Sequence, residues 1–234
     1  MRARPLHRFV LSCAFLVAAG CDRGQASPPP GGARPPALLA AWQHAAERVR
    51  TCEARFDLVK SLPGYDEEIR ASGILRYRRT EGDRIEVLFH TREPEELLER
   101  VTPDLFETYA PADRCLERRR LEEGSAVQRA FRDALGVLVG AQALERYEVK
   151  EERSPARTLL LEPLDGGEER PVDWIRVTLS ERTRLPEAFS YATPEGEVRR
   201  WRLRDVRVNP DLTDTDLAIE VPEGTEVIED PGEE

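Results

Sequence analysis

The sequence IRASGILRYRR-TEGD-RIEVLFH, residues 69–90, contains two runs in which apolar and polar side chains alternate. Alternation with a period of two is typical of strands that bury one face. The four residues between the runs include Gly82, which favours a tight turn. This stretch therefore predicts an antiparallel hairpin whose strands cover 69–79 and 84–90.

Similar alternating runs lie on both sides of this hairpin, separated by turns rich in glycine and proline. They predict strands at 52–59, 97–101, 105–109, 114–121, 147–153, 158–164, 174–179, 188–191 and 198–208. Strands with one apolar and one charged face cover a core on one side only. Because a sheet of this many strands has to curl or close, we expect a mainly β fold with a curled antiparallel sheet.

Two segments have helical spacing instead. The first covers 36–49 and the second 125–144, where Ser125 is a suitable cap. We expect both helices to cover the apolar face of the sheet. A curled sheet covered by helices, and not by a second sheet, tends to leave a cavity between them.

The N-terminus has the form of an export signal. Three arginines precede an apolar run at 9–19, which is too short for a transmembrane helix. Small residues stand directly before Cys21, a pattern that resembles the bacterial lipobox, in which the cysteine receives diacylglycerol. We therefore expect a lipoprotein signal peptide at 1–20 and a membrane anchor at Cys21. An ordinary secretory signal followed by an unrelated cysteine is the alternative.

Residues 21–36 are rich in proline and glycine and predict a semi-extended tether. The folded domain then covers 37–228, followed by an acidic tail at 229–234. With 35 basic and 45 acidic residues the net charge is −10, which argues against nucleic acid as a partner.

Cys52 and Cys115 are the cysteines that follow Cys21. In an oxidising cell envelope two thiols suggest a disulfide. Two buried thiols that do not pair are the alternative, because a sequence does not show whether the Cβ atoms meet.

The sequence contains no recognisable catalytic motif. His44 and His90 have no metal-ligand spacing, and we expect surface or packing roles for both. Paired carboxylates lie in polar turns, whereas catalytic pairs need one desolvated carboxyl group. We therefore expect a protein that is not an enzyme and that has neither a cofactor nor a metal.

Arginines cluster on three of the expected strands, at 76–79, 118–120 and 199–204. They could form a cationic stripe for anionic lipid headgroups. We favour a solvated convex face with acidic partners on neighbouring strands, because Asp and Glu are as common nearby.

The order of motifs between residues 42 and 227 resembles the outer-membrane lipoprotein carrier (LolA-like) family. The matching stretches are ARF at 54–56, SGILRYRR at 72–79, PDLFETYAP at 103–111, LLLEP at 159–163 and LAIEVPEGTEV at 217–227. The resemblance implies an unclosed half-barrel, lidded by an N-terminal and a central helical segment, whose hydrophobic cavity accepts acyl chains of lipoproteins or other lipids.

The family's Arg-Pro motif supplies an arginine that bonds to the lid and keeps the empty protein closed. Arg79 takes that position here, while Thr80 replaces the proline. The resemblance therefore implies that Arg79 is a lid latch.

The apolar strand and helix faces supply the residues that we expect to line the cavity, although each could equally be part of a plain core. They are Phe56, Leu58, Leu75, Tyr77, Val87, Phe89, Phe131, Leu135 and Val139.

These features together predict a tethered lipoprotein on the periplasmic side of a bacterial envelope, which carries or receives acyl chains. Soluble carriers of the family have no lipid anchor, whereas the lipoprotein receptor with this fold does. That receptor presents an apolar residue on a protruding hairpin, but the hairpin at 91–96 here is polar. The alternative is an anchored sensor or assembly module that uses the fold to bind an envelope protein partner.

Overall fold

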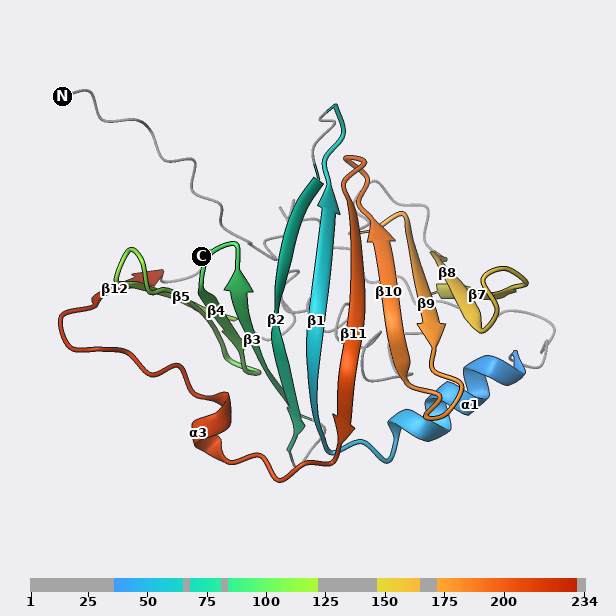
Figure 1. Cartoon of the computed structure of the whole chain (residues 1–234), viewed down its shortest axis with the longest axis horizontal. Coiled ribbons are helices and arrows are strands. Elements are labelled where there is room, and N and C mark those ends of the chain that lie inside the picture. The colour runs from blue at the N-terminus through green and yellow to red at the C-terminus, as the bar shows by residue number, and fades with distance from the viewer. Residues whose placement is uncertain (1–35, 65–67, 81–83, 122–146, 165–171, 231–234) are drawn as a thin grey trace, which may run out of the picture.

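The computed structural model describes residues 36–64, 68–80, 84–121, 147–164 and 172–230. The described strands form one twelve-stranded sheet in the order β12-β6-β5-β4-β3-β2-β1-β11-β10-β9-β8-β7 (Figure 1). Their bounds are β1 Thr51–Ser61, β2 Glu68–Arg79, β3 Ile85–Glu93, β4 Leu97–Val101, β5 Leu105–Ala110, β6 Cys115–Arg120, β7 Tyr147–Glu152, β8 Thr158–Pro163, β9 Trp174–Leu179, β10 Pro186–Ala192, β11 Val198–Val208 and β12 Glu226–Asp230.

The sheet consists of two antiparallel meanders, β1 to β6 and β7 to β11, joined by pairing between β1 and β11. The register places Phe56 opposite Leu203 and Leu58 opposite Trp201. β12 pairs with β6 in parallel and forms one edge, while β7 forms the other. The expected open antiparallel half-barrel is therefore confirmed.

The helix α1, Ala37–Ala46, is shorter than the predicted 36–49 because the chain turns into β1 after Ala46. The predicted central helix at 125–144 lies outside the described residues. Two elements were not predicted: the four-residue helix α3, Asp214–Leu217, and the strand β12. Both are too short to give a clear period, and β12 runs into the segment expected to be an acidic tail.

The main core lies on the concave face of the sheet. Trp42 of α1 is fully buried in it, together with apolar residues of strands from both meanders. The Phe89 and Trp201 ring centroids are 5.7 Å apart although β2 and β1 lie between their strands. Neighbouring strands are about 4.8 Å apart, so this contact requires a strong curl.

The C-terminal segment covers part of the opposite, convex face. Leu217 of α3 is fully buried, and α3 contacts β2 and β3. Arg76 donates a hydrogen bond to the Asp216 carbonyl at 3.1 Å, and Arg78 pairs with Asp214 at 2.7 Å. The sheet thus has a small second layer on its outer side.

Cys52 and Cys115 do not form the disulfide that the sequence suggested. Cys52 lies on β1 and Cys115 on β6, and four strands separate them in the sheet. Bridged cysteines need Cα atoms within about 7 Å, a condition that this strand order does not provide.

Candidate functional site

Six of the nine predicted cavity residues lie within the described structure, and all six are buried on the concave face. Their exposed fractions do not exceed 7%, and all belong to one hydrophobic cluster. They are Phe56, Leu58, Leu75, Tyr77, Val87 and Phe89. Phe131, Leu135 and Val139 lie outside the described residues.

Two aromatic residues that sequence reasoning missed complete this face. Phe189 of β10 stacks on Trp201 of β11, with ring centroids 5.5 Å apart and planes 9° apart. The ring centroids of Trp201 and Phe56 are 5.2 Å apart. Both occupy apolar positions in alternating strands, but the arginines on either side of Trp201 obscure that pattern in the sequence. Phe56, Phe89, Phe189 and Trp201 are called the aromatic wall below.

Gly73 makes the curl of this wall sterically feasible. The register places Gly73 of β2 opposite Phe56. A Cβ atom on Gly73 would lie 2.2 Å from the His90 carbonyl oxygen and 2.8 Å from Cζ of Phe56. The missing side chain therefore lets the Phe56 ring reach over β2 toward Phe89, where the centroids are 6.3 Å apart.

Polar groups interrupt the concave face at β3 and β4. Glu99 is only 3% exposed and Thr91 only 1% exposed. Burial raises the pKa of Glu99 to about 8, and the positive charge of Arg199 offsets only part of that effect. The burial of Glu99 could have been predicted from the sequence, because Glu99 shares its strand face with the apolar Val101.

A network of charges lies at the ends of β1 and β11. Glu197 accepts a hydrogen bond from Nε of Arg199 and forms an ion pair with Lys60 at 2.9 Å. Burial by itself raises the pKa of Glu197, but the hydrogen bonds from Lys60 and Arg199 outweigh it and hold that pKa below its usual range. Arg199 also lies over the Tyr191 ring at 5.9 Å.

Arg79 ends β2. Its backbone N–H donates to the Arg50 carbonyl at 2.7 Å, and its Nε donates to the Tyr77 hydroxyl at 3.2 Å. The central segment that it would latch is outside the described residues, so the latch stays a prediction.

The arginine clusters have acidic partners, as expected for a solvated convex face. Arg76 pairs with Glu53 at 2.9 Å and Arg204 with Asp57 at 2.8 Å, in each case on neighbouring strands. Such pairs neutralise arginine charges between neighbouring strands. The arginines therefore do not form an uncompensated cationic stripe.

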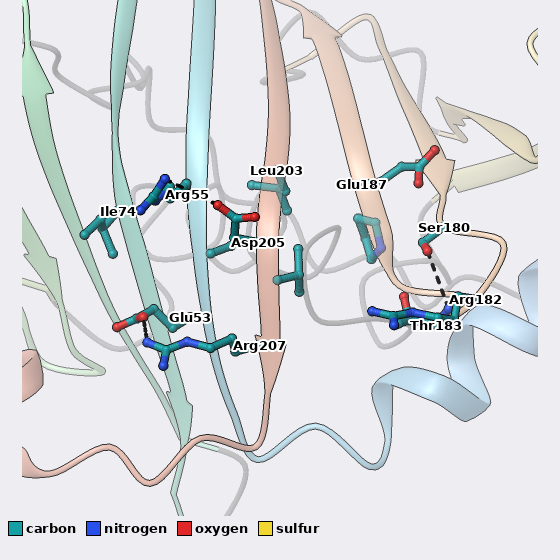
Figure 2. A pocket seen from close by; sticks show the side chains of 13 residues that line it. Glu53, Arg55, Ile74, Ser180, Arg182, Thr183, Glu187, Leu203, Asp205 and Arg207 are labelled. Atoms are coloured by element: carbon teal, nitrogen blue, oxygen red, sulfur yellow. Dashed lines mark hydrogen bonds and ion pairs between the residues drawn. The ribbon is translucent and has the colours of Figure 1, made fainter.

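A cleft opens where β10 and β11 separate (Figure 2). Pairing between these strands ends at Ala188 and Arg202, whereas β11 continues along β1 as far as Val208. Figure 2 shows Arg55 and Asp205 together on one side and Glu187 with Ser180 on the other. The cleft has a volume of about 730 Å³, and none of the nine predicted cavity residues lines it.

The cleft combines ion pairs with a few apolar side chains. Arg55 and Asp205 are 3.4 Å apart, and Arg207 pairs with Glu53. Leu203, Val206 and Pro186 supply apolar surface. This composition suits a polar or peptide-like ligand better than a long hydrocarbon chain.

Both histidines of the described residues lie beside a carboxylate. His44 is exposed near Glu47, and His90 contacts Glu96 at 2.8 Å. No group of three or more potential ligands for a metal ion occurs among the residues that the structure describes. In the same part of the chain, no helix has the length and apolar content needed to cross a membrane.

No family model and no curated protein matches the chain. Solved structures with a similar fold include a LolA superfamily protein from Nitrosomonas europaea, with 10% identity and a TM-score of 0.39 over 77% of this chain and 97% of that one. Mycobacterium tuberculosis lipoprotein LppX shares 14% identity, with a TM-score of 0.41 over 76% and 98%. The MucA/MucB complex of Pseudomonas aeruginosa gives 13% identity and a TM-score of 0.43, over 78% of this chain and 60% of that one. The similarity concerns the fold alone.

Proposed function

We propose that this protein is a membrane-tethered lipoprotein of the bacterial envelope that binds acyl chains of lipoproteins or other lipids and carries or receives them. The observation that supports this most is the aromatic wall on the concave face of an open sheet. An open sheet edge allows the wall to separate from the elements that cover it, which a closed barrel does not permit.

Burial of an acyl chain supplies the binding energy. Each methylene group removed from water contributes about 0.8 kcal/mol, so a long chain would be held very tightly by a preformed cavity. Cargo can leave only if opening the core for the ligand costs a comparable amount. A core that is closed and packed in the empty protein, as around Phe56 and Leu58, supplies such a cost.

The proposed anchor places this domain near a membrane. Lipidation of Cys21 would hold the chain durably, and the segment 22–36 would reach about 45 Å if extended at roughly 3 Å per residue. That reach lets the open face meet a membrane surface or an incoming lipoprotein on the periplasmic side.

The proposal is tested on the full chain, purified in detergent from bacterial membranes. Native mass spectrometry is expected to show bound acyl lipid, and a fluorescent fatty-acid probe is expected to be taken up. Phe89→Leu should weaken uptake several-fold, whereas Leu164→Ala at an exposed position should not. A consistently empty protein that takes up no probe would overturn the proposal.

The cleft between β10 and β11 favours a second candidate function, that of an anchored sensor or assembly module. The stretch 203–208 of β11 has β1 on one side and the cleft on the other. An extended peptide of a protein partner could add to this edge as a strand. Crosslinking in cells should then return one stoichiometric protein. Val206→Pro, at a cleft position that is not in register with β1, should abolish its recovery while lipid uptake continues.

A further inference from the structure

Among the buried polar side-chain atoms that have no hydrogen-bond partner within the described structure, three belong to residues next to Phe89 on the concave face of the sheet. They are Oε1 of Glu99, Oγ1 of Thr91 and Nε1 of Trp201. All three side chains are more than nine-tenths buried, with exposed fractions of 3%, 1% and 7%. An unpaired buried polar group costs about 1–3 kcal/mol, so the unbound protein carries an appreciable penalty here.

The three groups surround one residue of the aromatic wall. Phe89 lies directly opposite Glu99 in the pairing of β3 with β4. Thr91 follows Phe89 by two positions and therefore shares its strand face. Trp201 approaches Phe89 from β11, with the ring centroids 5.7 Å apart. β3 and β4 pair directly, and the curl of the sheet brings β11 close to them.

The cluster of Glu99, Thr91 and Trp201 carries no net charge at neutral pH. The raised pKa of Glu99, about 8, keeps its carboxyl group protonated at neutral pH. Its hydroxyl can then donate while its carbonyl oxygen accepts, and the Trp201 indole N–H and the Thr91 hydroxyl add two further donors. Arg199 is the charged group that influences Glu99, and it already bonds to Glu197.

We propose that Glu99, Thr91 and Trp201 form a subsite for the glycerol-ester group of a diacylglycerol unit whose acyl chains lie on the aromatic wall. The inference rests on the proposed function and names the polar part of the same cargo. Ester carbonyls accept hydrogen bonds and a glycerol hydroxyl donates or accepts, which matches the unpaired groups. A phosphate or ammonium group would need a buried counter-charge, because burying an unpaired ion is far more costly.

Competition for a bound fluorescent fatty-acid probe on the full chain tests this subsite. Dioleoylglycerol is compared with a dialkyl glycerol ether of equal chain length, which lacks the ester carbonyls. A peptide carrying diacylglyceryl-cysteine distinguishes a lipoprotein source of the same group from a free lipid. One or two lost hydrogen bonds predict that the ether competes about tenfold more weakly than the diester.

Substitutions locate the effect. Glu99→Leu should abolish the preference for the diester, and Glu99→Gln, which keeps a donor and an acceptor, should retain most of it. Glu95→Leu on the exposed hairpin is the matched control and should behave like wild type. Trp201→Phe and Thr91→Val remove one polar group each, and they serve as independent variants if Glu99→Leu does not fold.

The outcomes separate the two proposals. Uptake of the probe without any preference for the diester, or with a preference that survives Glu99→Leu, overturns the subsite but leaves acyl binding in place. That result would mean that the three groups bind only water. Failure of wild type to take up the probe or either lipid overturns acyl binding and the subsite together.

Discussion

The rings of Phe89 and Trp201 lie 5.7 Å apart, centroid to centroid, although two strands of the sheet separate their backbones. In a flat sheet this separation would be about 14 Å, because each strand adds about 4.8 Å. The contact therefore shows that the half-barrel curls strongly. It also places aromatic rings from both meanders in the same core, which couples the first half of the fold to the second.

Gly73 is expected to be essential for that curl. Gly73→Ala places a Cβ atom 2.2 Å from the His90 carbonyl oxygen, and backbone cannot move aside as a flexible side chain can. We expect a loss of about 3 kcal/mol in the free energy of unfolding, measured by urea titration. Ser72→Ala, one residue earlier on the opposite face, should change it by less than about 0.5 kcal/mol. Equal stability of both variants would contradict this account.

Stability is expected to depend on pH through Glu99. Its pKa is about 8 in the folded protein, against 4.5 for a glutamate exposed to water, so the folded state binds the proton more tightly. The stability it contributes is fully present below pH 4.5 and is lost as pH rises toward 8, with a slope of up to about 1.4 kcal/mol per pH unit. Unfolding titrations of wild type and Glu99→Gln should therefore diverge in slope across this window. Parallel curves would show that Glu99 is ionised in the folded protein.

The outer layer formed by α3 is expected to contribute to stability. Leu217 is fully buried, so Leu217→Ala removes packed methyl groups and should lower the free energy of unfolding by about 2–4 kcal/mol. Val221, which is exposed, is the matched site, and Val221→Ala should have little effect. Thermal unfolding monitored by circular dichroism checks both. If Leu217→Ala melts like wild type, α3 is not docked on β2 and β3.

The two cysteines of the folded domain are expected to be insensitive to reduction. No disulfide joins Cys52 to Cys115, so a reducing agent should leave the midpoint of thermal unfolding unchanged. Burial raises the pKa of the Cys52 thiol to about 11, which leaves little thiolate at pH 8. Cys52 should therefore react with iodoacetamide much more slowly in the folded protein than in urea, as peptide mass spectrometry can measure. A lower midpoint after reduction would indicate that the thiols pair.

The local alternation of apolar and polar residues was sufficient to predict most strands. The predicted bounds 97–101, 174–179 and 198–208 coincide with β4, β9 and β11, since alternation of apolar and polar residues is a property of each strand alone. Helix α1 was found in the same way, although its end was placed three residues too late. The short elements α3 and β12 were missed because four or five residues do not establish a period.

The sequence by itself determined which residues form the strands β1 to β11, which face of each is apolar, and that a many-stranded antiparallel sheet has to curl. Only the tertiary structure decided that β1 pairs with β11, that Gly73 lies beneath the Phe56 ring, and that Glu99, Thr91 and Trp201 gather around Phe89. It also decided that four strands lie between Cys52 and Cys115. The physical reason is the distance along the chain over which each effect acts. Periodicity reflects residues within one strand, whereas pairing and curvature depend on contacts between different strands, which for β1 and β11 join residues more than a hundred positions apart.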